Sequence, residues 1–172
     1  SHANEYDIIL KSPGIPTFDF DGITSAEKIS SQTDIFLQIY GSQTIGITGT
    51  KGKSTTTNLI YSIMKATKPN TIMAGNMGLP LFDSIGKIDS ETILVLELSS
   101  HQLENIHQGP HIGVLLNLFQ EHLDHYKSYR DYQMAKMNIG LHQSEKDIFI
   151  YCKDNETLDK LVEENNIRSI VL

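Results

Sequence analysis

A glycine-rich segment between a strand pattern and a helix pattern constrains this chain more than any other feature. Residues 46–55 read GITGTKGKST, after a short apolar strand pattern at 44–47. The segment opens a helix pattern at 54–67 with an apolar face. The members of that face are Leu59, Ile60, Ile63 and Met64. A strand, a glycine-rich loop and a helix in this order are typical of a site that holds the phosphates of a nucleotide.

The chemistry of such a loop explains its residue types. Glycines let backbone N–H groups turn toward phosphate oxygens, and the helix N-terminus adds a positive dipole end. Lys53 would reach the terminal phosphates, and the Ser54 hydroxyl would ligate Mg²⁺. An ordinary glycine-rich turn is the alternative, and the usual spacing places a glycine where Ile47 stands. The Lys-Ser pair favours the phosphate loop. The predicted nucleotide-binding residues are Gly49, Thr50, Lys51, Gly52, Lys53, Ser54 and Thr55.

Composition excludes several classes of protein. With 172 residues, 39% of them hydrophobic, the chain can bury the core of one substantial domain and has room for a fragment of another. A net charge of −7 without a basic run argues against nucleic acid as a partner. No apolar run approaches the roughly 20 residues that span a bilayer, and no signal peptide is visible. The single cysteine, Cys152, suits a reducing cytoplasm, where we expect the protein to act, without a membrane partner.

Strand and helix patterns alternate along the chain. Strand patterns lie at 6–10, 44–48, 71–74, 93–96, 111–116, 148–151 and 169–172. Helix patterns lie at 33–40, 54–67, 128–142 and 155–165. This alternation predicts an α/β fold, a parallel sheet flanked by helices on both faces around the phosphate loop. In such sheets, ligands bind beyond the carboxyl ends of the strands.

Polar residues follow four of the predicted strands and should therefore meet at one edge. They are the phosphate loop, the segment 75–78, the segment 97–102, and Asn117 with the segment 121–124. Glu97 stands out because it ends an apolar strand, where an acidic residue of phosphate-loop enzymes helps to hold Mg²⁺. A helix-capping or solvated carboxylate is the alternative.

Two further residues each allow two interpretations. His122 could be a structural histidine or a metal ligand, with Asp124 and His125 as neighbours for a transition metal. No cysteine lies nearby, and a phosphate loop favours Mg²⁺. Lys136 lies in a helical stripe with Tyr129, Tyr132 and Ile139. Burial there would lower its pKa and leave a neutral, nucleophilic amine, whereas a snorkelling lysine would keep its head in water.

Several motifs in order resemble one family. The phosphate loop GITGTKGKSTT, AGNMGLP, LELSSHQLE, and LLN followed by EHLDHY and YQMAK are similar to the Mur ligases of peptidoglycan synthesis. The resemblance runs from about Tyr6 to Ile139, and LKSPGIP with LELSSHQLE is most like the branch that adds D-glutamate. The family has a UDP-binding, an ATPase and an amino-acid-binding domain. We therefore expect 1–38 to be the end of the first domain with a linker, 39–172 to be an incomplete ATP-binding domain, and the third domain to be absent from this chain.

The resemblance implies a reaction. An ATP-dependent ligase of bacterial cytoplasm would phosphorylate the carboxylate of UDP-N-acetylmuramoyl-L-alanine, and D-glutamate would attack the acyl phosphate to form an amide. ATP and Mg²⁺ are the implied cofactors, the substrates are small molecules, and we expect a monomer. This chain by itself is expected to form no amide.

The resemblance also assigns roles to residues. It implies Lys53, His122 and Lys136 as catalytic residues, the lysine of the stripe being carbamylated, and four ligands of Mg²⁺. These ligands are Ser54, Glu97, His122 and Lys136. The implied substrate-binding residues are Ser12, Pro13, Gly14, Asn76, Ser99, Ser100 and Gln102. The chain departs from the family pattern at His101, Phe119 and Glu121, where phenylalanine, threonine and aspartate are usual.

Other functions remain compatible with the motifs. A folylpolyglutamate synthetase or a different muramyl ligase shares the same chemistry, although SPGIP argues against both. A non-catalytic nucleotide-binding module is a third possibility. The residues that argue against a degenerate site are the intact Lys53, Ser54, Glu97, His122 and Lys136.

Overall fold

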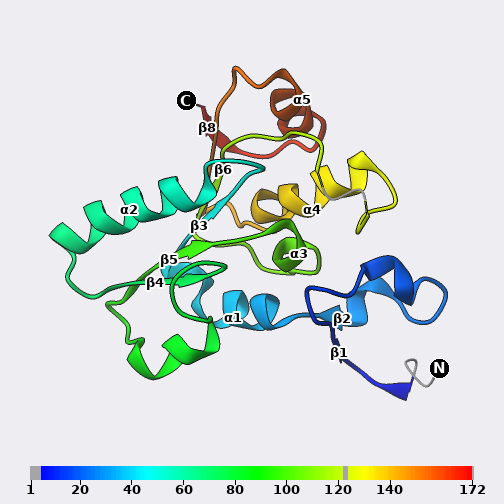
Figure 1. The fold of residues 1–172 in the computed structure, drawn as a ribbon, viewed down its shortest axis with the longest axis horizontal. Helices are drawn as coiled ribbons and strands as arrows, with labels where there is room; N and C mark the ends of the chain where they lie inside the picture. The colour runs from blue at the N-terminus through cyan, green and yellow to red at the C-terminus, as the bar shows by residue number, and fades with distance from the viewer. Residues whose placement is uncertain (1–4, 122–123, 172) are drawn as a thin grey trace.

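A six-stranded, wholly parallel sheet forms the centre of the protein. The computed structural model describes residues 5–121 and 124–171. The strand order is β4-β5-β3-β6-β7-β8 (Figure 1). The strands are β3 (Thr44–Thr48), β4 (Thr71–Gly75), β5 (Ile93–Glu97), β6 (Ile112–Leu115), β7 (Ile148–Tyr151) and β8 (Ser169–Val171). The predicted α/β class with a parallel sheet is confirmed.

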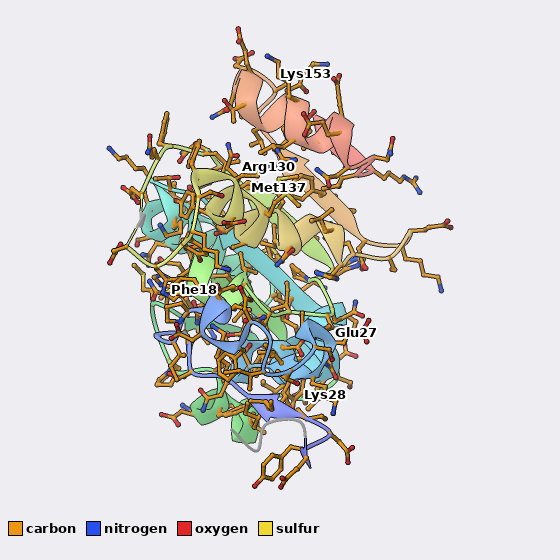
Figure 2. The ribbon with its side chains drawn as sticks, turned by 90° about the vertical axis from the view of Figure 1, so that its right-hand side faces the viewer. Phe18, Glu27, Lys28, Arg130, Met137 and Lys153 are labelled. Carbon is orange, nitrogen blue, oxygen red and sulfur yellow. The ribbon has the colours of Figure 1, made fainter. Side chains whose placement is uncertain are left out.

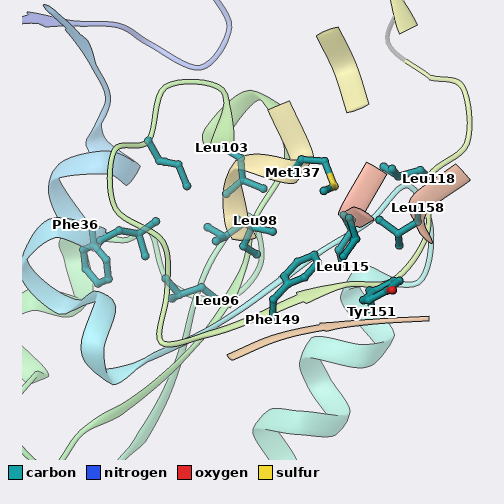
Figure 3. Packing of buried hydrophobic residues seen from close by; sticks show 14 of the residues in the cluster. Phe36, Leu96, Leu98, Leu103, Leu115, Leu118, Met137, Phe149, Tyr151 and Leu158 are labelled. Atoms are coloured by element: carbon teal, nitrogen blue, oxygen red, sulfur yellow. The ribbon is translucent and has the colours of Figure 1, made fainter. Parts of the chain in front are cut away.

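Helices connect the strands and cover both faces of the sheet. They are α1 (Gln32–Tyr40), α2 (Lys53–Thr67), α3 (Ser100–Leu103), α4 (Tyr129–Leu141) and α5 (Glu156–Glu164). From β3 the chain runs through α2 toward β4 at one edge, and from β6 through α4 toward β7 in the other direction. Because crossovers between parallel strands are right-handed, the two helices lie on opposite faces (Figure 3).

The main hydrophobic core lies between the sheet and the helices on the α4 face (Figure 3). Each strand contributes side chains that alternate between faces, and the helices close the layer from above. Its fully buried members include Phe36, Leu37, Leu96, Leu98, Leu103, Leu115, Met137, Ile139, Phe149 and Leu158. Gly140 allows α4 to approach β7, since a Cβ there would lie 2.9 Å from the Phe149 ring.

One expectation about local structure is wrong. The strand expected at 6–10 is only β1 (Ile9–Leu10), paired in parallel with β2 (Ile29–Ser30), and Tyr6 and Ile8 are exposed. A strand needs a partner for each of its backbone groups, and β2 offers only two residues. The helix predicted at 54–67 is confirmed as α2, although part of its apolar face is exposed. Leu59 is 59% and Ile63 is 65% accessible, and Thr57 is the helix's buried residue.

The N-terminal segment lies along one flank. Short 3-10 turns at Thr17–Phe20 and Ala26–Lys28 follow the β1 strand, and Figure 2 labels Phe18, Glu27 and Lys28 along this path. Two further 3-10 turns, Gly41–Gln43 and Phe82–Lys87, were not anticipated. None of the helices within residues 5–121 and 124–171 has the length and apolar character that crossing a membrane requires.

Candidate functional site

The phosphate-loop segment lies at the point where the direction of winding reverses. Strand β3 leaves through α2 toward β4 at one edge, whereas its neighbour β6 leaves through α4 toward β7 in the other direction. Gly49 has φ +154° and Gly52 has φ +84°, and a Cβ on Gly49 would lie 3.0 Å from Leu116 Cβ. These backbone conformations suit glycine alone. Helix α2 begins directly after Gly52 without a side-chain cap. The loop thus presents a helix N-terminus at the carboxyl end of the sheet, as predicted.

The end of β6 braces this loop through Asn117. Its side-chain oxygen accepts from Lys51 N–H at 2.9 Å, and its Nδ2 donates to Lys51 O at 3.0 Å. Thr50 N–H donates to Asn117 O at 3.0 Å. Asn117 therefore satisfies backbone groups of the loop at Thr50 and Lys51, as a neighbouring strand would. Its position directly after a buried strand predicts a place at the polar edge, but does not reveal this contact with the loop.

Tyr132 of α4 provides a second brace. Its hydroxyl lies 2.8 Å from Thr50 Oγ1, and the same Thr50 oxygen accepts from Phe119 N–H at 2.9 Å. Burial, the main cause, raises the pKa of Tyr132 to about 12. The tyrosine is therefore a neutral hydrogen-bonding group at ordinary pH. The predicted apolar stripe contained this residue, but not its contact with the loop.

Two lysines converge on one carbonyl of the loop. Lys53 Nζ donates to Gly49 O and to Thr50 O, each at 3.0 Å, and Lys136 Nζ donates to Gly49 O at 2.9 Å. Lys53 is half-buried, whereas Lys136 is 2% accessible. The snorkelling interpretation of Lys136 is therefore wrong, because its head does not reach water.

The environment of Lys136 favours the neutral amine. Burial, the main cause, and the nearby Lys53 ammonium lower the pKa of Lys136 to about 7, although the Glu121 carboxylate acts in the opposite direction. Its Nζ also lies 5.0 Å from the centre of the Tyr132 ring. A lysine that loses its proton near neutral pH can act as a nucleophile, as carbamylation would require.

Glu97 is a buried carboxylate, and one of its two oxygens accepts no hydrogen bond from the described residues. It ends β5 in register with Ile47 of β3 and is 2% accessible. Its Oε1 accepts from Asn76 Nδ2 at 2.8 Å, and its Oε2 has no hydrogen-bond partner among the described residues. The solvated-acid alternative is wrong, and the cap of the following helix is Ser99 rather than Glu97. A buried carboxylate oxygen without a partner is costly in isolation, so this site fits a cation.

The residues that the resemblance assigns to substrate binding lie beside Glu97, in the N-terminal turn and at the start of α3. Asn76 is exposed beside Glu97, and Ser12 and Gly14 are exposed in a turn far along the N-terminal flank. Ser99 and Gln102 already bond each other's backbone in a capping box at the start of α3, and Ser100 is buried. The spacing Ser-x-x-Gln is the sequence signal of such a cap.

The structure describes some of the remaining predicted residues, whereas His122 lies outside the described residues. Phe119 is half-exposed, and the His101 ring packs against those of His125 and Tyr126, with centroids 4.0 and 5.8 Å away. Within residues 5–121 and 124–171, no three side chains of histidine, cysteine, aspartate or glutamate gather as metal ligands would.

Comparison with known proteins supports the motifs. Residues 47–172 match the Mur ligase middle domain. The chain is 39% identical over 168 residues to the UDP-N-acetylmuramoylalanine–D-glutamate ligase of Bacillus velezensis, covering 95% of this chain and 37% of that protein. It is 36% identical over 163 residues to the enzyme of the same name from Clostridium acetobutylicum, covering 92% and 35%. The chain thus spans only 35–37% of the length of these relatives.

Solved structures share the fold. The MurF ligase of Thermotoga maritima in complex with ADP has a TM-score of 0.60 at 23% identity, over 87% of this chain and 38% of that one. A UDP-N-acetylmuramate:L-alanyl-gamma-D-glutamyl-meso-diaminopimelate ligase from Neisseria meningitides has a TM-score of 0.64 at 13% identity, over 97% and 58%. At these identities the likeness concerns the fold alone.

Proposed function

Because this chain belongs to the Mur ligase family, we propose that it is the ATP-binding part of a ligase that adds D-glutamate to UDP-N-acetylmuramoyl-L-alanine. The names of the relatives at 36% and 39% identity support this choice of substrates. Residues 1–38 would then be the end of a UDP-binding domain with a linker, and 39–172 the ATP-binding domain. The protein would act as a monomer in the bacterial cytoplasm.

The observation that carries the proposal is the loop at the reversal point of the sheet. Gly49 and Gly52 adopt the backbone that a phosphate cradle needs, and Lys53 stands at the first turn of α2. Its ammonium now satisfies two loop carbonyls, and it can turn to a phosphate oxygen, which forms the stronger charge-assisted bond. Asn117 and Tyr132 keep the loop in this shape before a nucleotide arrives.

The cation site is proposed next to this loop. Glu97 Oε2 is the buried oxygen that a Mg²⁺ ion would satisfy, with Ser54 at the start of α2 as a second ligand. Bound Mg²⁺ would neutralise the charge of the phosphates. His122 and a carbamylated Lys136 would serve a second ion. Since Lys136 is buried with a lowered pKa, it can supply the neutral amine that reacts with CO₂.

The substrate-binding residues are proposed from the family motifs, and Asn76, Ser12 and Gly14 among them are exposed. Asn76 donates its amide nitrogen to Glu97 and is exposed, and its side-chain oxygen would contact the muramoyl group. The start of α3, a few residues after Glu97, would contribute Ser99, Ser100 and Gln102. The diphosphate would be received by Ser12, Pro13 and Gly14.

Nucleotide binding can be tested on this chain by calorimetry. We expect weak Mg²⁺-dependent binding of ADP dominated by phosphate contacts, so that pyrophosphate competes. Lys53→Ala should abolish the binding, because a partly desolvated phosphate loses its charged partner. Lys68→Ala, at the far end of the same helix, is the matched control and should bind as the wild type does. Equal binding by Lys53→Ala would refute the assignment of the loop.

The reaction requires a test at the full length of the relatives. Such a polypeptide should release phosphate from ATP only when both UDP-N-acetylmuramoyl-L-alanine and D-glutamate are present. Turnover with folate, or with a longer muramyl peptide alone, would overturn the choice of substrates. Lys136→Ala should strongly lower the rate, and acetate should restore part of it by filling the vacated oxygen-ligand position. Near-normal turnover of Lys136→Ala without acetate would exclude the carbamate.

A further inference from the structure

A buried ion pair joins the N-terminal flank to the body of the protein. Lys11 Nζ lies 2.7 Å from Glu104 Oε2, and the two side chains are 1% and 11% accessible. Removing two charges from water is expensive, and it is tolerated only where geometry and further hydrogen bonds are good. Neither residue belongs to the phosphate loop or to the cation site. The position of this pair in the fold therefore requires a separate explanation.

Lys11 also closes the turn that follows it. Its Nζ donates to Ile15 O at 2.6 Å, and Ile15 N–H donates to Ser12 O at 3.0 Å. The ammonium thus holds the last carbonyl of the turn while the first carbonyl is held by the backbone. Ser12 and Gly14 remain exposed on this turn. The shape of the turn depends on where the Lys11 ammonium is anchored.

Glu104 anchors Lys11 to two other segments. It directly follows α3, and its Oε2 lies 3.3 Å from His125 Nε2. Its Oε1 accepts from Thr17 N–H at 3.4 Å, a longer contact on the far side of the same turn. One carboxylate thereby connects the turn at 12–15, the end of α3 and the segment that leads into α4.

We propose that Lys11, Glu104 and His125 are positioning residues that hold the Ser12–Ile15 turn in register with α3, so that the diphosphate and muramoyl parts of one substrate are received at a set separation. The inference rests on the proposed function, which assigns the diphosphate to this turn. Lys11 acts through the turn and does not touch the substrate, because it is 3% accessible and its ammonium is already engaged.

The test is steady-state kinetics of the ligase at the full length of its relatives. In Glu104→Gln, which keeps the shape and removes the charge, KM for the UDP substrate should rise by about tenfold, the equivalent of one lost positioning contact. KM for ATP and kcat should change by less than about threefold, because the phosphate loop is untouched. Lys11→Met should behave alike, and Lys11→Arg should retain most of the wild-type KM, since it preserves the charge.

An exposed ion pair on the same flank is the matched control. Lys127 pairs with Asp21, and both side chains are more than half exposed. Lys127→Ala should leave every constant within about twofold of the wild type, as expected for a surface pair. Calorimetric binding of Mg²⁺-ADP by each variant verifies that the fold is retained. Where Glu104→Gln fails this check, Lys11→Met and Lys11→Arg provide the comparison.

The outcomes separate the alternatives. If Lys11 bound the diphosphate directly, freeing it by Glu104→Gln would lower KM for the UDP substrate, and this result overturns the positioning role. Unchanged KM in a folded Glu104→Gln variant also overturns it, while wild-type turnover leaves the proposed function intact. A wild-type protein without D-glutamate-dependent turnover would instead refute the proposed function itself.

Discussion

Helices α2 and α4 each bring one lysine to the phosphate loop, but they do so from opposite faces of the sheet and in different surroundings. Helix α4 buries seven residues, and Thr57 is the buried residue of α2. The apolar periodicity of α2 is nevertheless clear in the sequence, at Leu59 and Ile63 among others. Periodicity predicts which side chains share a face, but the fold decides whether that face is covered.

The two helices also begin differently. Ser128 caps α4 by accepting from Asp131 N–H at 3.1 Å. Helix α2 follows Gly52, a left-handed residue without a side chain, and no side chain caps its first turn. The first N–H groups of a helix need partners outside the helix. A capped N-terminus supports packing, whereas an N-terminus without a side-chain cap is suited to an anion.

The largest expected difference between the helices is in core stability. Ile139→Ala on α4 removes a fully buried side chain and should lower the free energy of unfolding by about 2–5 kcal/mol. Ile63→Ala on α2 removes a side chain that is 65% accessible and should cost less than about 0.5 kcal/mol. Urea unfolding followed by circular dichroism measures both. Equal losses would mean that the α2 face is covered in solution.

The next difference concerns the pH dependence of stability. The pKa of Lys136 is about 7 in the folded protein and 10.5 in its ordinary state. Between these values the unfolded chain binds more protons on this side chain, so its contribution to the free energy of unfolding rises with pH. The slope should approach about 1.4 kcal/mol per pH unit and disappear in Lys136→Met.

This pH effect is measured by urea unfolding at pH 7, 8 and 9 in degassed buffer with EDTA, which keeps the amine free of CO₂ and of metal. Subtracting the Lys136→Met curve removes the titration of other groups. If the two curves run parallel, the lysine keeps an ordinary pKa despite its burial. Below pH 7 the lysine is charged in both states, so the difference should become constant.

The smallest expected difference lies at the two N-termini. Ser128→Ala should cost about 1 kcal/mol of stability, because α4 loses its cap, and it should leave Mg²⁺-ADP binding unchanged. The control Ser62→Ala, on the exposed surface of α2, should be within about 0.5 kcal/mol of the wild type. Thermal unfolding and calorimetry check the two parts. A loss of ADP binding in Ser128→Ala would show that the two helix starts are not independent.

The local features of the site were predictable from the sequence. The phosphate loop, the acidic end of β5 and the alternation of strands and helices each depend on residues close together along the chain. Gly49 and Gly52 adopt conformations that glycine alone tolerates, and Glu97 follows a run of apolar residues. Such patterns predict the elements and place their polar ends at one edge of the sheet.

The features that depend on contacts between distant segments became known only from the tertiary structure. The burial of Lys136 depends on the loop around Gly49, 87 residues earlier in the chain. The brace between Asn117 and Lys51, and the ion pair between Lys11 and Glu104, likewise join distant segments. A residue type by itself does not reveal such a partner. The free energy of burying a polar group depends on which protein groups take the place of the water molecules that it bonded before. The sequence therefore determined the phosphate loop and the sheet, and the packing of α4 decided the chemistry available to its lysine.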